Sequence, residues 1–243
     1  MYTYDPTLLA ALQTTPEAIP DVVQILQAID ATCADGDGLK WFNQLYLQVT
    51  QAVEAQVNSG GFANPSWMAA LDVRFARFYL EALRASLSGG SGGGAPGCWQ
   101  AVFAQRNQTA VARIQFALAG MNAHINHDLP QAVLAVCQAT AIPPQHGTPQ
   151  YNDFTALNST LGSLTEAAKV ELNVRLLGEV LPPVSNLENT LASWSLSAAR
   201  EAAWNNAELL WHLSDEPILS SAFLGTLDGL TAVASKTLMV PVP

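Results

Sequence analysis

Apolar residues recur at intervals of three and four along nearly the whole chain, the spacing of helices that bury one face. Between residues 21 and 32, for example, the apolar positions include Val22, Val23, Leu26 and Ile29. We find no alternating strand pattern of useful length. The sequence therefore predicts an all-α fold, in which residues 1–243 form a single compact bundle of about eight helices.

Turn-forming residues mark the expected ends of these helices. Asp37 is suited to cap a long helix that ends near Gly60, and Asn64 followed by Pro65 is a typical helix start. Further helices are expected over residues 151–178, 187–214 and 217–239. Residues 88–97 are rich in glycine, which predicts a flexible surface loop.

The composition limits the classes of function. Hydrophobic residues make up 49% of the chain and charged residues only 12%, which indicates a large core or burial in a homo-oligomer. The net charge is −10 without any basic run, which argues against nucleic-acid and polybasic membrane binding. We expect no transmembrane helix and no signal peptide. Three widely spaced cysteines favour a reduced, cytoplasmic setting.

The segment GMNAHINHDLP, residues 120–130, places amides, imidazoles and a carboxylate inside an apolar helical pattern. On a helix, His124 and Asp128 are four residues apart and can touch. The carboxylate can orient the imidazole as a general base, or both can bind a metal ion with His127 as a third ligand. The alternative is a hydrogen bond that satisfies two buried polar groups.

A second polar stripe is expected on the helix that spans residues 194–213. Arg200, Glu201 and Trp204 lie close together on a helical projection, and the alanine-rich surroundings predict a buried cluster. Burial raises the pKa of a carboxyl group toward the range that suits acid catalysis. Glu208 and His212 are interpreted as an exposed helical pair.

Other polar residues stand in apolar helical settings. The candidates for substrate binding are Tyr46, Asn158, Arg200 and Trp204, together with Asn122 and Asn126 of the first motif. Asp153 is interpreted as a charge at a helix N-terminus, and Asp72 as a structural ion pair with Arg74 or Arg77.

Five segments give the chain a wider resemblance. They are DGLKWFNQLY, LDVRFARFYLEAL, FALAGMNAHINHDLP, YNDFTALN and WSLSAAREAAW. Together they resemble a bacterial all-helical family of unknown function, and the motif GMNAHIN-x-DL is the most specific piece. The resemblance implies that Asn122, His124, Asn126, Asp128, Asp153, Asn158, Arg200, Glu201 and Trp204 belong to the family pattern. His127 and His212 resemble individual variation.

Three functions follow as hypotheses. The first is an enzyme of the cyclase, isomerase, lyase or hydrolase type, acting on a small, largely apolar substrate. In it, His124 oriented by Asp128 is the base, Glu201 the acid, and no cofactor is favoured. The second is a divalent-metal-dependent hydrolase with ligands His124, Asp128, Asp153 and Glu201. The third is a small-molecule-binding or scaffold protein without activity.

Overall fold

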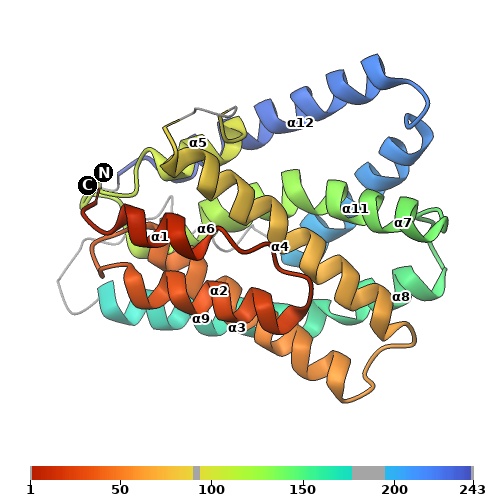
Figure 1. The fold of residues 1–243 in the computed structure, drawn as a ribbon, viewed down its shortest axis with the longest axis horizontal. Coiled ribbons are helices and arrows are strands. Elements are labelled where there is room, and N and C mark those ends of the chain that lie inside the picture. Colours follow the sequence, from red (N-terminus) through yellow and green to blue (C-terminus); the bar gives the residue numbers. More distant parts are fainter. Residues whose placement is uncertain (1, 90–93, 177–194, 242–243) are drawn as a thin grey trace.

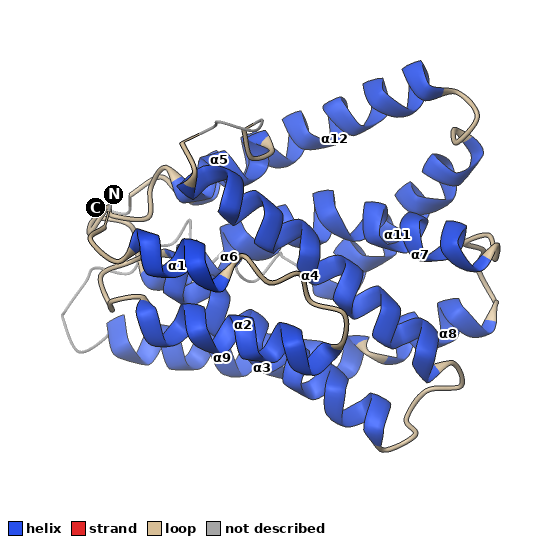
Figure 2. Cartoon of the chain, viewed as in Figure 1, coloured by secondary structure: helices blue, strands red, loops and turns tan. Residues whose placement is uncertain are grey.

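The computed structural model describes residues 2–89, 94–176 and 195–241, and in these ranges loops and turns connect helices, with no strands (Figures 1 and 2). The all-α prediction is confirmed. Nine of the described helices have eight or more residues, close to the predicted number of about eight. In chain order the elements are α1 (Asp5–Ala11), α2 (Ile19–Thr32), α3 (Leu39–Asn58), α4 (Pro65–Leu87), α5 (Gly97–Phe103), α6 (Arg113–Ala123), the π-helical turn η1 (His124–Asp128), α7 (Leu129–Thr140), α8 (Pro149–Ala156), α9 (Asn158–Leu176), α11 (Leu196–His212) and α12 (Pro217–Leu238).

The helix boundaries follow local chemistry. Pro65 occupies the first turn of α4, where its missing N–H leaves no hydrogen bond broken. Asp37 accepts a hydrogen bond from the backbone N–H of Leu39 at 3.0 Å and also pairs with Arg106, so it fixes the start of α3. The helix predicted for residues 151–178 is split between α8 and α9 at Leu157. Residues 90–93 of the glycine-rich loop, and residues 187–194 of another predicted helix, lie outside the described residues.

The segment α6–η1–α7 runs through the middle of the bundle. Contacts from α3, α4, α11 and α12 surround it, and every residue of α6 after Arg113 is buried. The α3 helix approaches closely at Gly120, where an added Cβ atom would lie 2.4 Å from the ring of Phe42. This glycine lets two backbones pack together, and the motif therefore lies inside the core rather than on an amphipathic surface.

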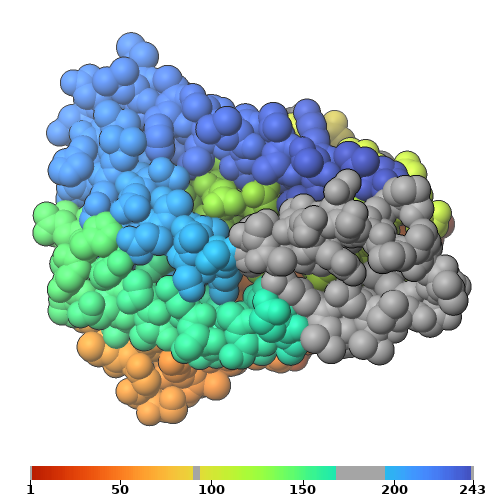
Figure 3. Space-filling model, turned by 180° about the vertical axis from the view of Figure 1, so that it is seen from behind, coloured from red at the N-terminus to blue at the C-terminus, as the bar shows by residue number. Residues whose placement is uncertain are grey.

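Helix α12 lies along one edge of the molecule, above α11 in the rear view (Figures 1 and 3). It is long and apolar enough to cross a membrane by length and composition alone. The expectation of no transmembrane helix rested on the charged residues that interrupt such apolar runs, which in this helix are Asp228 and Lys236. Several large apolar side chains of this helix are exposed, including Ile218 and Leu230. Its inner face packs against α5, α6 and η1, so α12 is a part of the helical bundle.

Candidate functional site

The motif containing His124 forms a π-helical turn between α6 and α7. A π-turn inserts an extra residue into the helical repeat, and such turns are frequent at functional sites. It also changes which side chains face one another, so a projection at 100° per residue fails beyond Ala123. As a result, the imidazoles of His124 and His127 both reach the carboxylate of Asp128.

The carboxylate of Asp128 is buried and accepts three hydrogen bonds. The indole Nε1 of Trp99 donates to Oδ2 at 2.8 Å, and Nδ1 of His124 lies 2.9 Å from the same oxygen. Nδ1 of His127 lies 2.7 Å from Oδ1. Burial alone would raise the pKa of Asp128, but the hydrogen bonds from both histidines outweigh burial and lower that pKa below its ordinary value. Asp128 is therefore an anion held by three N–H donors.

His124 is the neutral partner in this arrangement. Burial lowers the pKa of its imidazole, and the opposing effect of Asp128 is smaller. Nδ1 consequently carries the proton donated to Asp128, and Nε2 carries a lone pair. Nε2 is buried and has no hydrogen-bond partner in the part of the chain that the structure describes. The ring of Phe75 stacks on the imidazole with centroids 3.5 Å apart, and the ring of Tyr46 meets it edge-on at 4.6 Å.

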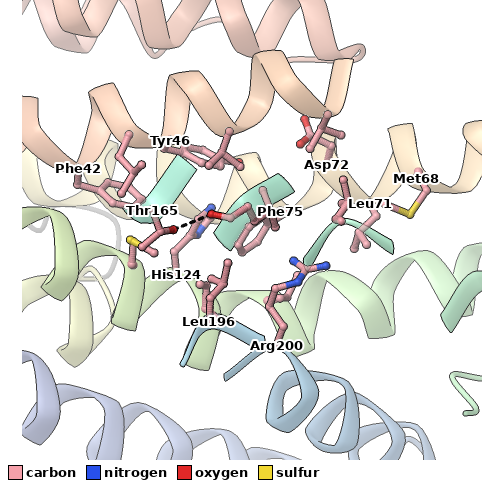
Figure 4. A pocket seen from close by; sticks show the side chains of 18 residues that line it. Phe42, Tyr46, Met68, Leu71, Asp72, Phe75, His124, Thr165, Leu196 and Arg200 are labelled. Carbon is pink, nitrogen blue, oxygen red and sulfur yellow. Dashed lines mark hydrogen bonds between the residues drawn. The ribbon is translucent and has the colours of Figure 1, made fainter. Parts of the chain in front are cut away.

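His124 lines a cavity of about 70 Å³ (Figure 4). Helices α3, α4, α6, α9 and α11 and the π-turn supply most of its wall. The wall is mainly aliphatic and aromatic. The lining residues with polar side chains are Tyr46, Asp72, His124, Thr165 and Arg200. An apolar cavity with a few polar groups is the usual form of a small-molecule site.

Asp72 was missed as a site residue. Sequence reasoning assigned it to an ion pair, but Arg77 instead donates to the carbonyl of Pro16 at 2.6 and 3.0 Å, and Arg74 lies over the ring of Phe78. One carboxyl oxygen of Asp72 is buried and has no partner within residues 2–89, 94–176 and 195–241. Burial, assisted by the charge of Glu54, raises the pKa of Asp72 to about 7. The cavity therefore holds a carboxyl group that is partly protonated at neutral pH.

Arg200 and Asn158, two predicted binding residues, do lie together. The guanidinium Nε of Arg200 donates to Oδ1 of Asn158 at 2.7 Å, and Nη2 donates to the carbonyl of Phe154 at 2.7 Å. The guanidinium also stacks over the Phe154 ring, 4.0 Å from its centroid. Arg200 and Tyr46 line the cavity with His124. Asn158 does not line it and instead holds the guanidinium of Arg200 by a hydrogen bond.

Glu201 lies elsewhere, and the expectation that it shares a buried site with His124 needs correction. Its carboxylate is 40% exposed and lies 2.8 Å from Nε2 of His146. The hydroxyl of Tyr151 donates to it at 2.9 Å. The hydrogen bond from His146 lowers the pKa of Glu201, so this group is an anion rather than an acid. About two helix turns further, Glu208 pairs with Nδ1 of the same His146 at 2.9 Å rather than with His212.

The asparagines of the motif also face away from the cavity. The side-chain amide of Asn122 donates to the carbonyl of Thr231 at 3.0 Å and to the hydroxyl of Ser235 at 2.9 Å, both on α12. Asn126 donates to the Asn122 carbonyl at 2.9 Å. The predicted substrate contacts of Asn122 and Asn126 are thus replaced by contacts that fasten α12 to the core.

Trp204 and Asp153 make contacts that hold the fold together, and neither residue lines the cavity. Trp204 is fully buried among aromatic rings, including Trp67 and Phe154, and does not line the cavity. Asp153 accepts backbone hydrogen bonds from Ala63 at 2.9 Å and Asn64 at 2.6 Å. It thus contributes a negative charge to the N-terminus of α4, not of its own helix.

The four residues proposed as metal ligands therefore do not gather at one point. Among the described residues, a different set, Cys98, His127 and Asp228, places its ligand atoms within 4.8 Å of one another. The oxygens of Asp228 already accept the backbone N–H groups of Gly97 at 2.8 Å and Cys98 at 2.9 Å. Burial raises the pKa of the Cys98 thiol. Asp228 thus caps the N-terminus of α5, and this role explains why the three side chains lie together.

The site and fold together define an all-helical protein with a buried, mainly apolar cavity next to a π-turn. The chain belongs to a family of unknown function (DUF5995), whose model matches residues 19–241. No curated protein and no solved structure matches it significantly. The family resemblance expected from the sequence is confirmed.

Proposed function

We propose that the protein is an acid–base enzyme that acts on a small, largely apolar organic molecule in the cavity beside His124. The observation that carries the proposal is the state of His124. Asp128 fixes its Nδ1–H, and Nε2, at the wall of an apolar cavity, has a lone pair but no partner among the residues described. A neutral imidazole oriented by a buried carboxylate is the arrangement of a general base.

Asp72 replaces Glu201 as the proposed acid. Its pKa of about 7 lets it hold or release a proton at neutral pH, and it lines the same cavity as His124. Removal of a proton at one point of the substrate and delivery at another supports isomerisation, cyclisation or elimination. Nε2 is enclosed and Phe75 lies flat on the ring, so a substrate reaches the base only when a side chain such as Phe75 moves.

Untargeted turnover provides the test. Wild-type protein and the variants His124→Gln, Asp72→Asn and Glu201→Gln are incubated with a mixture of small metabolites, and mass spectrometry follows which compounds are consumed. Glu201→Gln is the matched control because its carboxylate is exposed and outside the cavity. Far-UV circular dichroism shows that each variant is folded.

We expect wild type and Glu201→Gln to consume the same compound, and His124→Gln to lose at least a hundredfold in rate, the size typical of acid–base catalysis. Retained turnover in folded His124→Gln refutes the assignment of the base. If no compound is consumed while ligands still bind the cavity, the protein is a non-catalytic binding protein. Activity that disappears with a chelator and returns with a divalent ion favours the metal-dependent alternative.

A further inference from the structure

The cavity wall contains a buried cation that has no anionic partner among the described residues. Arg200 is only 5% exposed, and its hydrogen bonds go to two neutral acceptors, the amide of Asn158 and the carbonyl of Phe154. In the described part of the chain, no carboxylate lies within ion-pair distance of its guanidinium. A charge taken out of water needs a paired opposite charge to recover its lost hydration.

The remaining donors of Arg200 are suited to an incoming anion. A guanidinium has five N–H groups, and the described contacts use one on Nε and one on Nη2. The side chain extends from α11 into the cavity (Figure 4). Asp72, the carboxyl group that also lines this cavity, is separated from Arg200 in that view, and only burial and Glu54 shift its pKa. It does not neutralise Arg200.

We propose that the natural ligand of this cavity is a small apolar carboxylic acid, whose carboxylate pairs with Arg200 while its hydrocarbon part occupies the aliphatic wall. A planar carboxylate matches the fork of N–H groups on a guanidinium. The inference rests on the proposed function, because it names the substrate class of the same cavity. The charge supplied by Arg200 selects the acid, and the surrounding leucine and valine side chains select an apolar chain.

The volume of the cavity indicates which chain lengths of carboxylic acid fit it. A volume of about 70 Å³ holds roughly five to seven water-sized groups. Butanoate and pentanoate have six and seven non-hydrogen atoms, so short unbranched or singly branched acids fit the unexpanded cavity.

The experiment compares pentanoate with pentanamide, a neutral compound of nearly the same shape, by isothermal titration calorimetry at pH 7.5. We expect pentanoate to bind on the order of ten- to a hundredfold more tightly, the ratio typical of one or two charge-assisted hydrogen bonds. This comparison uses wild-type protein, so it does not depend on whether a variant folds. Equal affinities, or no binding of either compound, overturn the inference.

Variants then assign the preference to Arg200. Arg200→Gln removes the cation and should abolish the preference for pentanoate, whereas Arg200→Lys should keep part of it. Arg74→Gln is the matched control, because Arg74 is exposed and lies over Phe78 outside the cavity. A preference that survives in folded Arg200→Gln overturns the assignment. His124→Gln should keep the preference, so loss of the base and loss of the anion site are distinguished.

Discussion

Substitution of Asp128 by asparagine measures how much the buried hydrogen-bond network contributes to the fold. In wild type, the Asp128 carboxylate accepts from Trp99 at 2.8 Å, from His124 at 2.9 Å and from His127 at 2.7 Å. Asparagine keeps the shape but has one acceptor oxygen and no charge. The amide oxygen can retain two donors, while its NH₂ group faces the third.

The expected loss of stability follows from this count of hydrogen bonds. Two hydrogen bonds change from charge-assisted to neutral, and the third is lost unless His127 changes tautomer. We expect the free energy of unfolding to fall by about 2–4 kcal/mol, after allowing for the smaller desolvation of a neutral side chain. Urea unfolding at pH 7, followed by circular dichroism, should show a midpoint lower by roughly 1 M. A loss below about 1 kcal/mol, or no difference from the exposed control Asp215→Asn, would refute the network as a source of stability.

Four further predictions concern packing and charge. Gly120→Ala places Cβ 2.4 Å from a phenyl ring of α3 and should reduce the free energy of unfolding by about 1–3 kcal/mol in urea. Gly162→Ala, at a helical position with open space, should raise it by about 0.5–1 kcal/mol. Because burial lowers the pKa of His124, its contribution to stability is complete above about pH 6.5 and shrinks as pH falls below it; His124→Gln should flatten this part of the stability profile. Glu201→Gln should lower the raised pKa of His146, measured by NMR, without changing ligand affinity; an unchanged pKa contradicts that pairing.

Helical spacing was sufficient to predict the class of fold. The apolar positions of α2 and α3 lie in the core as the pattern indicated, because their spacing places them on one face of each helix. The pattern did not locate the break at Leu157, where no proline or glycine marks the boundary. The short helices α1 and α5 depend on contacts with other elements, which local spacing does not contain.

The candidate site was predicted only in part, for a physical reason. The pairing of His124 with Asp128 is local, so a spacing of four residues was enough to predict it. The polar partners of Glu201 are His146, in a loop 55 residues away, and Tyr151, on α8 and 50 residues away, and no helical projection of α11 can show them. His146 follows two prolines in a loop and gave no periodic signal. Asp72 stood among apolar residues of α4, and an unpaired carboxyl inside such a pattern was the signal that the ion-pair interpretation overlooked.

The contrast between Asp128 and Arg200 favours ligand binding over a purely structural role for the cavity. Both are buried, and both could serve only to set the packing of helices. Asp128 is satisfied by three N–H donors, as a structural charge should be. Arg200 has neutral acceptors and spare N–H groups at a cavity wall. If Arg200 had only a packing role, an apolar residue of similar size would give a more stable fold. An anion that binds in the cavity is therefore the best explanation for a cation at this position.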